Sequence, residues 1–102
     1  MTTSTGIFRI AIRSRFPLAT RLNGREARDF VLACLREHEV VVLDFEHFAP
    51  SPSFADECVG RLAQTIGLGS FKSRIRMANV PEPAKPLIKH VVLRRTRELT
   101  VP

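Results

Sequence analysis

The segment FAPSPSFADE, residues 48–57, holds the side chains whose types and spacing are best suited to chemistry. Ser51 and Ser53 carry hydroxyl groups that could accept a phosphoryl group, and Asp56 and Glu57 follow closely. A phosphoryl group at a helix N-terminus meets unpaired backbone amides and a favourable dipole, although the two carboxylates would repel it. The alternative is a simple helix start, which we favour because Ser53 and Asp56 have the spacing of a capping box.

Acid–base and nucleophilic chemistry have little support elsewhere in the chain. Asp44 and Glu46 alternate along a predicted strand, so their carboxylates point to opposite faces and do not form a pair. The glycine-rich GLGS at 67–70 follows a predicted helix instead of opening one, so its amides cannot bind a phosphate at a helix start. A serine nucleophile needs an adjacent base, and the nearest histidine, His47, reads as an ordinary loop residue. We therefore expect a protein that is not an enzyme and uses no cofactor.

The cysteines and histidines do not have the spacing of a metal site. Cys34 and Cys58 both fall on apolar faces of predicted helices, where a reduced thiol packs as a small hydrophobic side chain. The chain has no Cys-x-x-Cys pair, and His38, His47 and His90 are scattered. This pattern excludes a zinc site.

The length and composition are those of one soluble globular domain. The chain has 102 residues, of which 44% are hydrophobic and 25% are charged. No run approaches the about 20 apolar residues that a membrane span needs, and arginines interrupt the apolar N-terminal stretch, which argues against a secretory signal. We expect a cytoplasmic protein without membrane contact, with flexible ends at residues 1–5 and 99–102.

Charge is unevenly distributed along the chain, whose formal net charge is +6. Residues 1–25 carry five arginines and no acid, residues 26–60 carry two bases and eight acids, and residues 61–102 carry nine bases and two acids. Because the 48–57 turn lies in the acidic block, a protein that docks there is expected to be basic.

The basic ends allow a second hypothesis, nucleic-acid binding. Phosphate contacts would come from Arg9, Arg13, Arg15, Arg21, Arg74, Arg76, Lys89, Arg94 and Arg95 if these share one face. The chain has no Tyr or Trp and no recognisable reading helix, so we place this hypothesis second.

The first half of the chain is predicted to contain two strands and a helix. The stretch GIFRIAI at 6–12 alternates as a strand does, and Pro17 interrupts the basic connector that follows. Asn23 and Glu26 form a capping-box pattern at the start of an amphipathic helix that runs to about His38. The next segment, EVVVLDF, is apolar on both faces, as a central strand of a sheet covered by helices requires.

The second half is predicted to alternate in the same way. A helix begins after Ser53 and ends at Gly67 and Gly69. The stretch SRIRMANV is a strand, with Ile75 and Met77 facing inward, and a last helix covers about residues 83–98. The order strand, helix, strand, helix, strand, helix predicts a small α/β domain with a mixed, mostly parallel sheet and helices packed against it.

The segment VVVLDFEHFAPSPSFADECVGRL is similar to the central block of the STAS-like domain family of unknown function. Members have a strand ending in LDF, a serine-rich turn, then SFADE and a small Gly-Arg or Gly-Lys segment. The resemblance extends through LATRLNGREARDFVLACL upstream and FKSRIRMANVPEPAKPLIKHVV downstream, so it covers about residues 18–95 of a single domain, 1–102. It implies an α/β fold, in agreement with the predicted element order.

STAS domains are named for sulphate transporters and anti-sigma-factor antagonists, and the antagonists carry a phosphorylated serine within an Asp-Ser-Ser-Gly segment of this turn. On a gapless fit the Asp position falls on Ser51, the acceptor on Pro52 and the following serine on Ser53. Since proline cannot accept a phosphoryl group, the resemblance implies a regulatory partner-binding module more than a phosphorylation switch.

The resemblance also indicates a class of partner. An anti-sigma-type factor or a kinase-like ATPase is expected to bind the 50–57 turn and the following helix, with Phe54, Asp56 and Glu57 on the contact surface beside Ser51 and Ser53. A third hypothesis is a homodimer formed by edge pairing of an outer strand.

Overall fold

The sheet of this protein is parallel throughout the residues that the structure, a computed structural model, describes (6–97 of 102). The strands are β1 (Ile7–Ala11), β2 (Val40–Asp44) and β3 (Ile75–Ala78), in the spatial order β1-β2-β3. The prediction that the valine-rich strand is central is confirmed. The predicted flexible ends, 1–5 and 99–102, lie outside the described residues.

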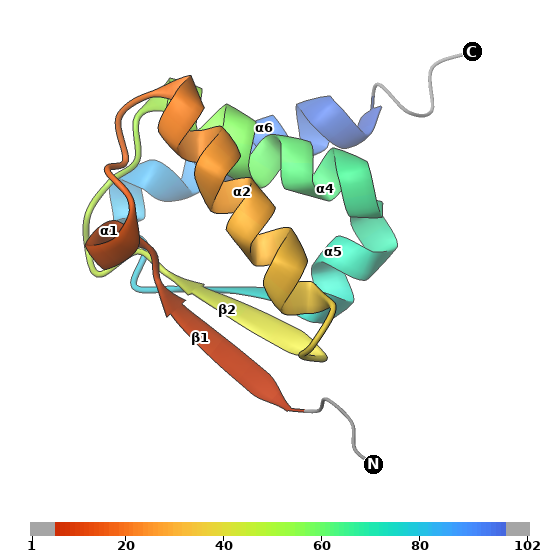
Figure 1. The fold of residues 1–102 in the computed structure, drawn as a ribbon. Coiled ribbons are helices and arrows are strands. Elements are labelled where there is room, and N and C mark those ends of the chain that lie inside the picture. Colours follow the sequence, from red (N-terminus) through yellow and green to blue (C-terminus); the bar gives the residue numbers. More distant parts are fainter. Residues whose placement is uncertain (1–5, 98–102) are drawn as a thin grey trace.

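Helical elements connect the strands and close the domain (Figure 1). Their bounds are α1 Ile12–Arg15, α2 Arg21–Leu35, α3 Pro52–Ala55, the π-helical turn η1 Asp56–Gly60, α4 Arg61–Ile66, α5 Leu68–Arg74, the 3₁₀ turn η2 Glu82–Ala84, and α6 Lys85–Arg97. Elements α3, η1 and α4 follow one another without a break, so residues 52–66 form one helix with a wide turn in its middle. The predicted α/β class and alternating order are confirmed.

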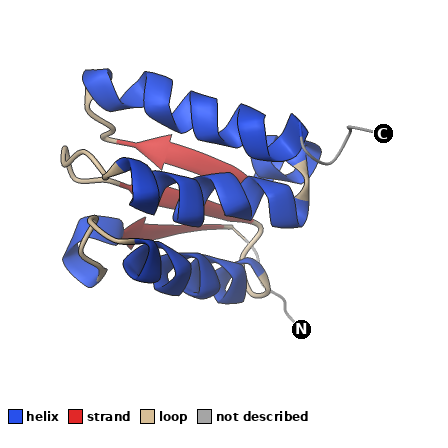
Figure 2. Ribbon diagram, turned by 90° about the horizontal axis from the view of Figure 1, so that it is seen from above, coloured by secondary structure: helices blue, strands red, loops and turns tan. Residues whose placement is uncertain are grey.

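The helices cover one face of the sheet (Figures 1 and 2). Val41 and Leu43 point toward the helices and are fully buried, while Val40 and Val42 alternate to the other face and are half-buried. The prediction of a strand buried between helices therefore holds for one face only, within the described part of the chain.

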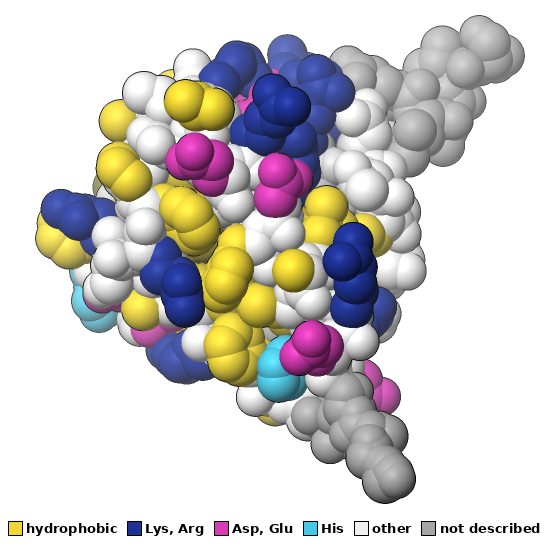
Figure 3. Space-filling model, in the orientation of Figure 1, with side chains coloured by type: hydrophobic (Ala, Val, Ile, Leu, Met, Phe, Trp, Pro, Cys, Tyr) yellow, Lys and Arg dark blue, Asp and Glu magenta, His cyan; other side chains and the backbone are white. Residues whose placement is uncertain are grey.

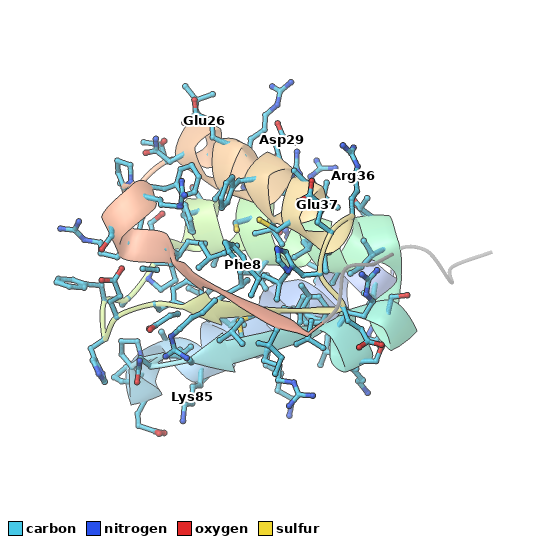
Figure 4. The ribbon with its side chains drawn as sticks, turned by 60° about the horizontal axis from the view of Figure 1, so that its bottom comes forward. Phe8, Glu26, Asp29, Arg36, Glu37 and Lys85 are labelled. Carbon is cyan, nitrogen blue, oxygen red and sulfur yellow. The ribbon has the colours of Figure 1, made fainter. Side chains whose placement is uncertain are left out.

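The core lies between the sheet and the helices. It joins strand residues, the apolar stripe of α2 and the inward side of residues 52–66 and α6. Its largest fully buried side chains are Phe45, Phe54, Ile10, Ile12, Leu43 and Leu62. At the β1 edge, the ring of Phe8 stacks on that of His38 with centroids 4.6 Å apart, and Figure 4 shows Phe8 beneath α2. Both β1 and β3 are edge strands, and pairing of either into a homodimer stays a prediction.

The start of α2 corrects the sequence-based assignment. Thr20, not Asn23, is the N-cap, and its hydroxyl oxygen accepts a hydrogen bond from the backbone N–H of Asn23 at 3.0 Å. Asn23 instead occupies the third helical position, and its side-chain oxygen accepts a bond from the Thr20 hydroxyl at 2.8 Å. The predicted capping box of Asn23 and Glu26 is therefore wrong: the helix begins three residues earlier, with Thr20 as an N-cap whose hydroxyl also binds the Asn23 side chain.

A second correction concerns the segment before β3. Gly67 ends α4 with φ +90°, a conformation open to glycine, and a further helix, α5, then occupies residues that were read as a loop and the start of a strand. Arg74 closes this helix, and its guanidinium donates to the carbonyl oxygens of Leu35, His38 and Glu39 at 2.7–3.0 Å. Arg74 thus satisfies the last carbonyl of α2, that of Leu35, and two carbonyls of the loop that follows.

Candidate functional site

The proline–serine turn is fixed at both ends by Ser51. Its hydroxyl donates to the carbonyl of Ala19 at 2.8 Å and accepts from the N–H of Phe54 at 3.0 Å, while its backbone N–H donates to the carbonyl of Leu18 at 2.8 Å. Ser51 is therefore the N-cap of α3, and Pro52 occupies the first helical position. The prediction that Ser53 is the cap is wrong, since Ser53 is the second residue inside the helix.

Two of the predicted contact residues are inside the molecule. Phe54 is fully buried in the core and Asp56 is 3% exposed, so neither side chain is available to a visiting protein. Ser51, Ser53 and Glu57 are half-buried. The prediction that this segment binds a partner remains, but the direct contacts expected of Phe54 and Asp56 are wrong: Phe54 packs in the hydrophobic core, and Asp56 binds Arg95 of α6.

Asp56 is held by arginines from both ends of the chain. The guanidinium of Arg95 donates Nε to Oδ1 at 2.8 Å and Nη2 to Oδ2, Arg21 Nη1 lies 3.0 Å from Oδ2, and Arg94 Nη2 lies 3.2 Å from Oδ1. Hydrogen bonds from Arg95 and Arg21 hold the pKa of Asp56 well below its usual range, against the opposing effect of burial. The carboxylate joins α3–α4 to α2 and α6.

Glu57 is held in the same manner one residue on. Arg28 donates to its Oε2 at 2.9 Å and to its backbone carbonyl at 2.8 Å, and Arg21 Nη1 reaches Oε1 at 3.0 Å. Burial raises the pKa of Glu57, but the hydrogen bonds from Arg28 and Arg21 outweigh it, so the net shift is downward. The wide η1 turn presents the backbone carbonyl of Glu57 to Arg28. This contact holds α2 against the helix of residues 52–66.

These contacts explain the uneven charge of the chain. The basic N-terminal and C-terminal blocks fold onto the acidic middle, and Figure 3 shows Lys and Arg side chains gathered along the upper edge of the molecule over η1 and α6. The acidic residues beside the turn are already paired, so the reason to expect a basic partner is lost.

The same contacts bear on the nucleic-acid hypothesis. Among its proposed phosphate contacts, Arg21, Arg94 and Arg95 are bound to Asp56, Arg9 to Asp44 at 2.8 Å, and Arg74 to the end of α2. Internal ion pairing gives these side chains a structural role. Nucleic-acid binding stays a prediction, which a salt titration of DNA and RNA binding tests directly.

A second cluster lies at the carboxyl edge of the sheet, where parallel α/β folds commonly place ligands. Oδ1 of Asp44 accepts from Asn79 Nδ2 at 2.9 Å and from the N–H of Glu46 at 2.8 Å, and Oδ2 accepts from Arg9. The bond from Asn79 is the main cause of a lowered pKa of Asp44. The carboxylate fixes two neighbouring loops, and the N–H of His47 adds a bond to the carbonyl of Asn79 at 2.9 Å.

These two loops are unusual in their backbone. Glu46, His47 and Asn79 have φ of 54°, 67° and 54°, in the left-handed region that non-glycine residues enter at a cost. Asp44 and Glu46 are the residues of this cluster that the sequence brought to notice, as a carboxylate pair excluded from catalysis, and Asn79 was missed. A signal was present, because Asn tolerates this region better than most residues and stands near the end of the stretch predicted as the third strand.

Two large apolar side chains are exposed beside the turn, and the sequence reasoning missed both. Phe48 is 51% exposed with the guanidinium of Arg13 4.7 Å above its ring, and Leu22, near the start of α2, is 62% exposed. Leu22 could have been noticed because it lies off the inward stripe of its helix. Both lie on segments that Ser51 ties together.

An open cavity of about 690 Å³ lies between α5, β3 and α6. Apolar side chains line it, chiefly those of Phe71, Met77, Val80, Ile88 and Val92, together with His47 and Asn79 from the carboxyl edge. It was not foreseen, because its α5 wall was not predicted as a helix.

The described residues include both cysteines and the histidines that were considered for a metal site. Burial raises the pKa of the Cys58 thiol to about 12, and Cys34 is half-buried, so both cysteines pack as predicted. Within residues 6–97 no group of three or more His, Cys, Asp and Glu side chains is placed to hold a metal ion. No described helix has the length and apolar character to cross a membrane.

The protein is a small α/β domain in which the turn after the central strand leads into a helix capped by Ser51, at the carboxyl edge of the sheet. A family model described as the STAS-like domain of unknown function matches residues 23–85, and the chain belongs to that family. Neither the curated proteins nor the solved structures contain a match.

Proposed function

We propose that this chain is a non-enzymatic regulatory module that binds a partner protein through what we call the turn surface, formed by Leu22, Phe48, Pro52 and Ser53. The observation that carries the proposal is that Phe48 and Leu22 expose about half or more of their apolar side chains on either side of a turn that is internally fixed. Aromatic side chains in such positions commonly dominate binding energy.

Preorganisation of the turn favours this role. Ser51 satisfies its own hydroxyl and caps α3, and the Asp44 cluster fixes the loop from which Phe48 projects. The N–H of Phe48 also donates to the carbonyl of Phe45 at 2.9 Å. A surface that is ordered before binding loses less conformational entropy when the complex forms.

The charge around the turn surface suggests the chemistry of the partner. Arg13 covers the ring of Phe48, and Arg21 follows Thr20 with about half of its side chain exposed, while Asp56 is paired internally. We therefore expect an apolar recess with an acidic rim on the partner. The family resemblance suggests that this partner is an anti-sigma-type factor or a kinase-like ATPase.

Site-specific photo-crosslinking in the native host tests the proposal. A benzophenone amino acid in place of Phe48 should give a discrete crosslinked product with one protein. The matched control position is Ile7, which is 65% exposed on β1. The same label there should give no such product. Equal products from both positions, or none from position 48, would contradict the proposal.

A further inference from the structure

The cavity between α5, β3 and α6 has the dimensions of a small-molecule site. Its volume of about 690 Å³ lies within the range of roughly 300–1,000 Å³ typical of ligand pockets. Along α6 it extends from Lys85 to Leu93, nine residues separated by eight rises of 1.5 Å and therefore about 12 Å. A cavity of this length is longer than a single ion would occupy, and it suits an extended organic chain.

The inner wall of the cavity is apolar. Ile88 and Val92 present one side from α6 and are 8% and 7% exposed, while Met77 and Phe71 form the opposite side from β3 and α5. Because these side chains are recessed, a flat bilayer surface would not reach them. A single chain of methylene groups that enters the cavity would remove both the apolar lining of the cavity and its own surface from water.

The rim of the cavity is cationic. Lys72 reaches it from α5, and Lys85 and Lys89 reach it from α6, whereas none of the described lining residues is acidic. Lys85 pairs at 2.6 Å with Glu82, whose own side chain is 84% exposed, and no ion pair engages Lys72 or Lys89 within residues 6–97. An anionic head group at the rim would therefore meet positive charge without displacing a buried partner.

Backbone strain points independently to the same place. His47 and Asn79 line the cavity at the carboxyl edge, and both have φ in the left-handed region. The Asp44 cluster and the bond from the His47 N–H to the Asn79 carbonyl maintain these conformations. Strain that neighbouring contacts must hold in place is concentrated at functional sites.

We propose that this cavity binds a free anionic amphiphile, with its apolar chain along Met77 and Val92 and its carboxylate at Lys85 and Lys89. The apolar interior accommodates the chain and the lysine rim pairs with the negative head. The recessed position of Ile88 and Val92 favours a free molecule over a bilayer. This proposal does not depend on partner binding at the turn surface.

Titration of the full chain with decanoate, below its micelle concentration, tests the proposal by calorimetry and by amide chemical shifts. Decanoate should bind with one-to-one stoichiometry and shift the resonances of Met77 and Val92. Decanol and decyltrimethylammonium, which lack the negative head, should bind at least tenfold more weakly. Exclusive binding to anionic vesicles, or to an acidic amphipathic peptide without any response to decanoate, would overturn it.

Charge reversal separates the rim from general basicity. Lys89→Glu, at an exposed position, should weaken decanoate binding at least tenfold. Arg36→Glu changes the net charge equally, and Figure 4 shows Arg36 on the outer side of α2, away from Lys85, so it should change affinity less than twofold. Leu93→Trp should fill the cavity and weaken decanoate and decanol alike. Equal effects of Lys89→Glu and Arg36→Glu would contradict the proposed site.

Discussion

Asp56 and Arg95 form a two-point ion pair across 39 positions of sequence, with Nε on Oδ1 at 2.8 Å and Nη2 on Oδ2. The side chains are 4% and 14% exposed, so the pair is nearly removed from water. It fastens the last helix to the turn that follows the central strand, and Arg21 and Arg94 complete the cluster.

Asp56→Asn should destabilise the fold strongly. The amide keeps the size of the side chain but removes its charge and leaves Arg95 partly uncompensated, and breaking a buried ion pair typically costs about 3–5 kcal/mol. Urea unfolding at pH 7 measures the change in the free energy of unfolding. A loss below about 0.5 kcal/mol, the usual effect of surface substitutions, would contradict a structural role for the pair.

The contribution of Asp56 should depend on pH in a defined direction. Its pKa in the folded state lies below the unfolded value of about 3.9, so its stabilisation is fully present above that unfolded pKa and is lost as pH falls through the folded pKa. The stability difference between the wild type and Asp56→Asn should be constant from pH 7 to 5 and shrink as the pH falls below 4. A difference that grows on acidification would show that the sign is wrong.

Two glycines should respond oppositely to alanine. A Cβ on Gly24 would lie 3.0 Å from the carbonyl oxygen of Phe54 and from Cβ of Glu57. Gly24→Ala should therefore force α2 away from the helix of residues 52–66 and cost about 1–3 kcal/mol of stability. A Cβ on Gly69 would meet nothing within 4 Å, so Gly69→Ala should stabilise α5 by about 0.5–1 kcal/mol. Thermal unfolding of both variants checks the pair, and equal shifts would refute the close approach at Gly24.

The serines of the turn should differ in their contribution to stability. Ser51→Ala removes the cap of α3 and the bond to Ala19 and should cost about 1 kcal/mol or somewhat more. The Ser53 hydroxyl makes no hydrogen bond within the described part of the chain, so Ser53→Ala should change the free energy of unfolding by less than about 0.5 kcal/mol. The reverse order in denaturant titrations would restore Ser53 as the cap.

The strands and their order could be predicted because hydrophobic alternation reports directly on them. The unbroken run from Val40 gave the central strand, and Ile75 and Met77 gave the inward face of β3. Helix starts were less certain, because Thr20 and Ser51 each precede a second residue of capping type by two or three positions. The spacing alone does not decide between such neighbours. At the turn, the bonds that Ser51 donates to the carbonyls of Leu18 and Ala19 do.

The site depends on contacts that sequence reasoning does not reach. Phe54 and Asp56 lie next to the exposed turn along the chain, yet the helix capped by Ser51, two residues before the predicted cap, places Phe54 in the core and Asp56 against α6. The pairing of Asp56 with Arg95 and of Asp44 with Asn79 joins residues more than 30 positions apart. The cavity arises only when α5 and α6 flank β3, and no local pattern indicates that arrangement.

The most direct test of partner binding at the turn surface is the affinity of the crosslinked partner for three alanine variants, measured by calorimetry with each variant shown to be folded. Phe48→Ala and Leu22→Ala should each weaken binding at least tenfold, because they truncate the exposed apolar contacts. Ile7→Ala, an equally exposed truncation on β1, should change the dissociation constant less than twofold. Dissociation constants for Phe48→Ala and Leu22→Ala that equal that of Ile7→Ala would contradict the account.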